Sequence, residues 1–306
     1  EPFSDSSQIP TFLISELARS KVTVSLSGDG GDELFGGYNR HILNHNHWKK
    51  LSRVPLSIRK IFSNVTNSIS ISTLNRAYNL FYRLFPSTFH VSYFGDKIHK
   101  LADIVSINDS LTLYKRLISN IDESNDIIIN GCNNNEDIFS NNDIWNDFSC
   151  STDAMMFFDL ISYLPDDILV KVDRASMGVS LESRAPYLDH KVVEFAWKIP
   201  ISMKIRHGHG KWILRKVLNT YIPNIDFERP KMGFGIPIDK WLKNELKDWA
   251  ESLLEENRLK NDGFLNHKLV IDKWHDHQKG IRNNQYFLWN ILMFQAWLDN
   301  SMSITS

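Results

Sequence analysis

A glycine-rich loop with three carboxylates contains the residue types most suggestive of chemistry in this 306-residue sequence: residues 27–38 read SGDGGDELFGGY. The loop lacks the Lys followed by Ser or Thr of a common phosphate-binding loop. Carboxylates repel phosphate unless a hard cation lies between them, so Asp29, Asp32 and Glu33 predict a Mg²⁺-bridged phosphate site or a general base. An ordinary strand-to-helix turn, with acidic residues favoured by the helix dipole, is the alternative.

The segments before the loop are the elements that would position it. Residues 9–19 carry apolar side chains at helical spacing, and residues 21–26 alternate apolar with polar side chains as a strand does. A strand that ends in a glycine-rich turn before a helix is how open α/β sheets place ligands at their carboxyl edge. The sequence therefore predicts a helix, a strand and a site at the end of that strand.

The chain beyond the loop is predicted to be mostly helical, with no internal repeat. Residues 130–147 are rich in Asn and predict a surface loop. A capped helix at residues 153–164 should end at Pro165, and the next helix should cover residues 166–176. Residues 238–298 read as helical, and we expect the tryptophans there to pack in a core.

Composition argues against several classes of protein. Lys and Arg total 35 and Asp and Glu total 36, so the formal net charge is −1 and no global field would draw the chain onto nucleic acid or an anionic membrane. No apolar run approaches the roughly 20 residues of a membrane-spanning helix. Two cysteines outside any C-x-x-C pair argue against a disulfide scaffold or a Cys-based zinc site, and favour a cytoplasmic location.

Other polar residues allow more than one interpretation. His41 and His45 are spaced as a helical metal pair would be, but no H-E-x-x-H motif accompanies them, and we expect solvated surface histidines. Lys211 and Arg215 could face the active cleft or form local salt bridges. Arg184 could bind the α-carboxylate of an amino acid or form a structural ion pair.

A series of ordered motifs resembles the glutamine-hydrolysing asparagine synthetase family. It starts with the loop at residues 27–38 and continues, in the family's order, with DRASM at 173–177, ESRAPYLD at 182–189, Gly210-Lys211 and Arg215, and RPKMGF at 229–234. The resemblance implies an α/β fold of the adenine-nucleotide α-hydrolase (N-type ATP pyrophosphatase) type, here helix-rich.

The family's reaction is ATP-dependent amidation of aspartate, a carbon–nitrogen ligase activity. The synthetase domain uses ATP and Mg²⁺ to adenylate the aspartate side chain, and pyrophosphate leaves. Ammonia, released from glutamine by an N-terminal glutaminase domain on the same chain, travels through an internal tunnel and displaces AMP to give asparagine. These substrates and this partner domain are what the resemblance implies here.

The resemblance also implies roles for individual residues. Ser27 and Gly28 match the loop that contacts the nucleotide, and Asp32 matches a Mg²⁺ ligand. Asp29 matches an acidic position associated with forming and aminating the adenylate, where it would act as a base or as an electrostatic group. Lys231 matches a lysine that neutralises charge on the triphosphate as pyrophosphate departs.

The resemblance is incomplete at the start of the chain. Nothing matches the family's Ser-Gly-Gly-x-Asp-Ser loop or its glutaminase domain, and the sequence opens at Glu1 without Met. We therefore expect residues 1–306 to be a truncated synthetase domain, inactive alone, with a homodimer as one conceivable assembly. Two alternatives stay open: a related amidotransferase acting on a sugar acid or secondary metabolite, and a non-catalytic relic or partner chain.

Overall fold

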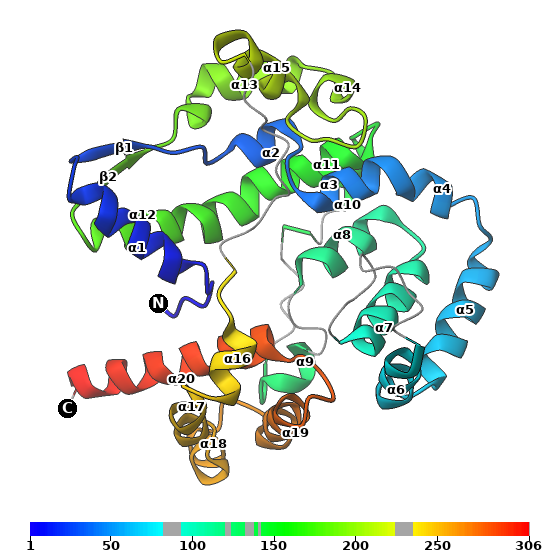
Figure 1. Cartoon of the computed structure of the whole chain (residues 1–306), viewed down its shortest axis with the longest axis vertical. Coiled ribbons are helices and arrows are strands. Elements are labelled where there is room, and N and C mark those ends of the chain that lie inside the picture. The colour runs from blue at the N-terminus through cyan, green and yellow to red at the C-terminus, as the bar shows by residue number, and fades with distance from the viewer. Residues whose placement is uncertain (82–92, 120–123, 132–137, 140–141, 224–234, 306) are drawn as a thin grey trace. The chain divides into compact units, whose positions relative to one another are not determined.

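The computed structural model describes residues 1–81, 93–119, 124–131, 138–139, 142–223 and 235–305 (Figure 1). The chain forms two compact units. The helical unit contains Glu1–Ser4, Val54–Asn135 and Pro237–Ser306, and the loop unit contains Asp5–Arg53 and Glu136–Ile236. No sequence pattern had indicated this division of the expected single domain.

A two-stranded parallel sheet leads into the glycine-rich loop in the loop unit. The elements around it are α1 (Gln8–Arg19), β1 (Val24–Leu26), α2 (Gly31–Phe35), α12 (Val170–Met177) and β2 (Glu182–Arg184). β1 pairs with β2, and α1 packs against α12. The predicted helix and strand before the loop are thus confirmed. β2 was not predicted, because three residues are too few to show an alternating pattern.

One continuous helical stretch runs through Pro165, where the sequence predicted a break. It consists of α11 (Ser151–Phe158), the π-helix η4 (Asp159–Leu169) and α12. The prediction of a helix end was wrong because it assumed α-helical bonding, in which the proline ring clashes with a carbonyl one turn earlier. In the wider π-helical turn the bonding partner is five residues away, and we attribute the tolerance of Pro165 to this change.

The loop unit contains further helical elements, some of which pack around a small apolar core. They are α3 (Asn39–Leu43), η1 (Asn44–Trp48), α4 (Lys49–Leu51), α10 (Asn142–Asn146), η5 (Pro186–Leu188), α13 (His190–Lys198), α14 (Ile201–Lys204) and α15 (Trp212–Tyr221). Leu34 and Phe35 of α2 pack with Ala196 in this core. Within the Asn-rich stretch expected to be a surface loop, Trp145 of α10 is buried against Phe158, whereas Asp143 and Asn146 of the same helix are exposed.

The helical unit consists of two groups of helices. The first is α5 (Leu56–Ser68), α6 (Ile71–Phe81), α7 (Phe94–Val105), α8 (Ser110–Ile118) and α9 (Ser124–Ile127); the second is α16 (Ile238–Lys243), α17 (Lys247–Leu253), α18 (Glu256–Asp262), α19 (His267–Gln278) and α20 (Gln285–Thr305). Trp274 and Trp289 are buried, which confirms the expectation that tryptophans pack here. Among the described residues, no helix combines the length and apolarity needed to cross a membrane.

A buried histidine lies within a polar cluster of the helical unit. His277 is fully buried, its Nδ1 accepts the backbone N–H of Asn284 at 3.3 Å, and its Nε2 lies 3.6 Å from Asp239. Asp239 accepts hydrogen bonds from Tyr93 at 2.8 Å and from Lys243 at 2.7 Å. Burial, aided by the charge of Lys243, lowers the pKa of His277 from 6.5 to about 4. The ring is therefore neutral at pH 7.

We expect acid to destabilise the protein through His277. Since the folded-state pKa is about 4 and the unfolded value is 6.5, the neutral ring stabilises the fold above pH 6.5, and this contribution is lost as the pH falls toward 4. At pH 5 the loss should be about 2 kcal/mol. His277→Asn, which keeps an acceptor for Asn284, should flatten this dependence. Denaturant unfolding at pH 7 and pH 5 tests it, and equal pH slopes in the two proteins would contradict it.

Candidate active site

The acidic loop begins at the carboxyl end of the parallel strand pair. Ser25 lies opposite Ser183 in the sheet, and the backbone N–H of Ser27 bonds to the carbonyl of Arg184 at 2.8 Å, which continues the ladder by one residue. The chain then turns through Gly28 and Asp29 into α2. The predicted nucleotide residues therefore lie at the edge of the sheet where open α/β folds bind ligands.

Two glycines are required by the close packing of this loop. Gly30 has a φ of +84°, a left-handed conformation, and a Cβ there would collide with the side chain of Leu188. A Cβ on Gly37 would fall on the carboxylate of Asp32 and would also meet Lys211. The Gly37 backbone therefore lies directly against both of these charged side chains.

Asp32 is paired with Lys211 in the structure. The Lys211 ammonium is 2.9 Å from Oδ2 of Asp32, and each side chain is 27% exposed. Lys211 has a φ of +54°, immediately before α15, and its N–H bonds to the carbonyl of Phe35 at 2.9 Å. Of the two arrangements left open for Lys211, the structure shows neither a local salt bridge nor a free side chain in a cleft: Lys211 reaches the acidic loop and pairs with Asp32, the predicted Mg²⁺ ligand, which is distant in the sequence. Arg215 instead donates to the carbonyl of Gly210 at 3.1 Å.

Glu33 has a different environment from the other two carboxylates of the loop. It is buried, and its Oε1 accepts a hydrogen bond from the hydroxyl of Tyr38 at 2.5 Å. Burial raises the pKa of Glu33, against the lowering effect of the Tyr38 hydrogen bond. Burial and the adjacent Glu33 also raise the pKa of Tyr38 far above its ordinary value. Asp29 and Asp32 are only partly buried, so they are the carboxylates of the loop that a ligand can reach.

A buried ion-pair cluster lies behind the loop. Asp159 is fully buried and accepts two hydrogen bonds from Arg40, at 2.8 and 3.0 Å, and contacts Nε2 of His41 at 2.6 Å. Burial alone would raise the pKa of Asp159, but Arg40 and His41 hold this pKa below its ordinary value. The Arg40 guanidinium also stacks over Tyr38, 4.1 Å from the ring centroid. The cluster thus connects η4 to the chain just after the loop.

The expectation of a solvated His41 was wrong. The ring is fully buried beside Asp159, and burial lowers the pKa of His41. The sequence pattern could not show this, because the partner carboxylate lies far along the chain, in η4. Arg184, left open above, pairs with Glu182 at 2.7 Å, and both side chains are exposed.

The carboxylates of the loop decide whether it can hold a metal ion. No group of three or more His, Cys, Asp or Glu side chains that could hold a metal occurs within the described ranges. A site built entirely by this part of the protein is thus unsupported, whereas Mg²⁺ commonly binds through one or two carboxylates together with substrate phosphates and water. Asp32, partly exposed beside the glycine-rich turn, fits the latter arrangement. Lys231 lies outside the described residues.

The model of the asparagine synthase family matches residues 1–299, so the chain belongs to this family. It is 30% identical over 299 residues to asparagine synthetase (glutamine-hydrolyzing) 1 of Bacillus subtilis, which covers 97% of this chain and 43% of that protein. A putative asparagine synthetase (glutamine-hydrolyzing) of Mycobacterium bovis is 28% identical over 300 residues, with 97% and 42% covered.

A third relative matches a shorter segment. Putative asparagine synthetase (glutamine-hydrolyzing) 2 of Methanocaldococcus jannaschii is 35% identical over 184 residues, 58% of this chain and 30% of that protein. The chain therefore spans less than half the length of each of these relatives. The family resemblance inferred from the motifs is confirmed.

We expect Asp159→Asn to lower the free energy of unfolding by about 3 kcal/mol, because it leaves the charge of Arg40 without its buried partner. Urea denaturation of the two proteins measures the difference. Asp299→Asn, which removes an exposed pair with Arg258, is the matched control and should cost no more than about 1 kcal/mol. Equal losses of unfolding free energy in the two variants would contradict this prediction, because the buried ion pair would then contribute no more to stability than the exposed one.

Proposed function

We propose that the intact protein containing this chain forms asparagine from aspartate, ATP and ammonia derived from glutamine. The observation that carries the proposal is the acidic loop: Asp29 and Asp32 lie partly exposed at the carboxyl end of β1, in a chain that the family model matches over residues 1–299. A carboxylate pair beside a glycine-rich turn suits a phosphate ligand only when a cation is shared with it.

In the proposed reaction, a side-chain oxygen of aspartate attacks the α-phosphorus of ATP and pyrophosphate leaves. Ammonia then attacks the acyl carbon of the aspartyl-adenylate, AMP leaves, and the nitrogen loses one proton. Ser27 and Gly28 contact the nucleotide, and Asp29 takes up that proton or stabilises the positive nitrogen. Lys231 neutralises the charge that develops on pyrophosphate.

Asp32 would hold Mg²⁺ in this scheme, and the ion would supply positive charge to the phosphates of ATP. In the structure Asp32 already has a cationic partner, because the ammonium of Lys211 lies 2.9 Å from its Oδ2. Lys211 is itself able to bind a phosphate oxygen, so we propose that it turns from Asp32 to the phosphates when the metal–nucleotide complex binds. Lys211 is a residue to which the motif comparison had assigned no role.

The proposal extends to the fold. We propose an adenine-nucleotide α-hydrolase sheet of which β1 and β2 are one part. Val24 and Leu26 of β1 are 37% and 75% exposed, which is unusual for parallel sheets because both of their faces are normally covered. Further strands and a glutaminase domain would belong to the same polypeptide, in keeping with the greater length of the relatives.

Asp32→Asn should weaken Mg²⁺–ATP binding by at least about 10-fold, because a neutral amide is a poorer Mg²⁺ ligand than a carboxylate. Isothermal titration of the intact protein with ATP, with Mg²⁺ and with chelator, measures this. The variant should lose affinity only when Mg²⁺ is present. Glu251→Gln, at an exposed carboxylate paired with Lys247, is the control and should bind like wild type. If Asp32→Asn lowers the affinity for ATP by the same factor in the presence of chelator, this result would argue against Asp32 as a metal ligand.

Lys231→Ala should lower aspartate-dependent pyrophosphate release by about 100-fold or more, since it removes a charge needed in the transition state. Lys247→Ala, at an exposed lysine, is the control and should retain the wild-type rate. Release assays on the intact protein also test the substrate. A wild-type protein that releases pyrophosphate with another carboxylic acid but not with aspartate would redirect the proposal to a different amidation. No release with any acid would overturn it.

A further inference from the structure

The helix that carries Asp32 is very short. α2 contains only five residues, Gly31–Phe35, and glycines in the left-handed conformation lie at both of its ends, with φ of +84° at Gly30 and +65° at Gly36. Gly30 is the N-cap and has no side chain to cap the helix. A first helical turn is unfavourable by itself, because several residues are ordered for one hydrogen bond. The orientation of α2 therefore depends on its contacts with the rest of the loop unit.

Apolar contacts restrain α2 on one side of Asp32. Leu34 and Phe35 are buried and pack with Ala196 in the core of the loop unit. Successive helical residues are about 100° apart around the axis, so Asp32 lies between Phe35 on one side and Glu33 on the other. The direction of the Asp32 side chain is thus fixed only if Glu33 is restrained as well.

The restraint on Glu33 is a single side-chain hydrogen bond. Glu33 is 1% exposed, and its Oε1 accepts the hydroxyl of Tyr38 at 2.5 Å, a short distance even for a hydroxyl bound to a carboxylate. Among the described residues, Tyr38 is the side chain that donates to Glu33. Solvent does not replace a lost donor at a buried acceptor, so such a loss is costly. Without the hydroxyl, we expect Glu33 to turn away and α2 to turn with it.

The ring of Tyr38 is itself held in place. The Arg40 guanidinium lies over it, 4.1 Å from the ring centroid, and Arg40 donates two hydrogen bonds to the buried Asp159. The rings of His41 and Tyr163 contact Tyr38 edge-on, with centroid distances of 5.4 and 5.7 Å. The hydroxyl of Tyr38 is therefore a fixed point against which Glu33 is positioned.

A backbone bond connects the same two segments. The N–H of Gly37, the residue before Tyr38, donates to the carbonyl of Asp32 at 2.8 Å. Asp32 and Glu33 are thus joined to Gly37 and Tyr38 by one backbone and one side-chain hydrogen bond. The backbone bond limits how far the segments separate, whereas the side-chain bond restrains rotation of α2 about its axis.

We propose that Tyr38 is a positioning residue for Asp32. Its hydroxyl holds Glu33 in the interior, and this contact keeps the neighbouring carboxylate of Asp32 directed toward the Mg²⁺–ATP complex. The inference rests on the metal role proposed for Asp32 above. Tyr38 does not touch the ligand in this assignment, so it contributes geometry and no charge.

The variant Tyr38→Phe keeps the ring and removes only the hydroxyl. Isothermal titration of the intact protein with ATP, once with Mg²⁺ and once with chelator, measures its effect. We expect Mg²⁺–ATP to bind at least about 5-fold more weakly, in keeping with the loss of one hydrogen bond, and ATP with chelator to bind as in the wild type. Tyr93→Phe is the matched control, because it removes a hydroxyl that donates to Asp239 at 2.8 Å in the helical unit. It should bind both forms like wild type.

Hydrogen exchange of the protein without metal or nucleotide tests the positioning directly. The N–H of Gly37 bonds to Asp32, and the N–H of Leu34 bonds to the carbonyl of Gly30 at 3.0 Å. Both should exchange at least about 5-fold faster in Tyr38→Phe, because α2 is less restrained. The N–H of Val193, bonded to Asp189 at 2.9 Å in the same unit, should keep its wild-type rate, which separates this effect from general destabilisation.

Three results would overturn the inference. The first is an equal loss of ATP affinity with Mg²⁺ and with chelator, which would indicate a general structural role for Tyr38. The second is wild-type Mg²⁺–ATP affinity in Tyr38→Phe, and the third is unchanged exchange at Gly37 and Leu34. If Asp32→Asn also binds Mg²⁺–ATP like wild type, the metal role of Asp32 fails. If Asp32→Asn loses affinity and Tyr38→Phe does not, only the role of Tyr38 fails.

Discussion

The carboxylate of Asp159 is ionised at a position that solvent does not reach, and the arrangement of the loop unit depends on how that charge is compensated. Arg40 and His41 supply hydrogen bonds to both of its oxygens. Arg40 lies over Tyr38, and Tyr38 donates to Glu33 of α2, the helix that follows the glycine-rich turn. A continuous set of polar contacts thus runs from η4 to the helix behind the loop. Removing a member would leave a buried charge or donor uncompensated.

This arrangement divides the three carboxylates of the loop by environment. Glu33 is committed to Tyr38 in the interior, so it supports α2 from inside. Asp29 and Asp32 stay partly exposed on the side where the strand ends. The lack of a side chain at Gly37 leaves room for Asp32 and Lys211 to pair, because a Cβ there would collide with both side chains. Three acidic residues within five positions of the sequence therefore have two kinds of environment, one buried and one partly exposed.

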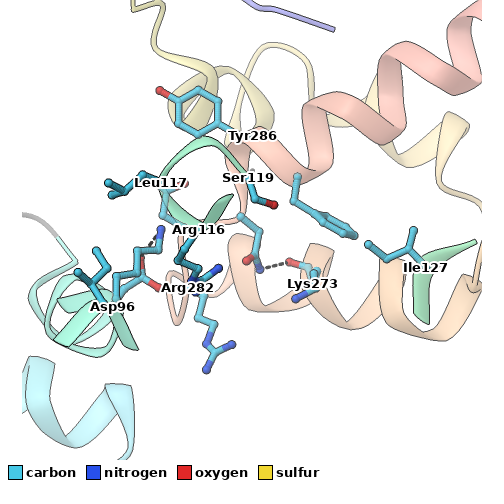
Figure 2. A pocket seen from close by; sticks show the side chains of 13 residues that line it. Asp96, Arg116, Leu117, Ser119, Ile127, Lys273, Arg282 and Tyr286 are labelled. Atoms are coloured by element: carbon cyan, nitrogen blue, oxygen red, sulfur yellow. Dashed lines mark hydrogen bonds and ion pairs between the residues drawn. The ribbon is translucent and has the colours of Figure 1, made fainter. Parts of the chain in front are cut away.

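The helical unit contains two polar features that differ in their exposure to solvent. His277 is enclosed, neutral and adjacent to Asp239, so its contribution to stability depends on excluding a proton. A pocket with lining from α7, α8 and α19 (Figure 2) has exposed charged side chains at Lys100, which pairs with Asp96, and at Arg282. Asn284 links the two features along the chain, because its N–H bonds to His277 while the residue also lines the pocket.

The sequence by itself determined the features set by local chemistry. The helix and strand before the loop follow from apolar spacing, the family follows from ordered motifs, and the helical tail with buried tryptophans follows from composition. Tertiary structure decided the pairing of β1 with β2, the burial of His41, the passage of the helix through Pro165, and the contact of Lys211 with Asp32. All of these except the passage through Pro165, which we attribute to π-helical bonding five residues along the chain, depend on partners distant in the sequence. Local patterns report the period of a segment, whereas burial and charge pairing are fixed only when distant segments pack together.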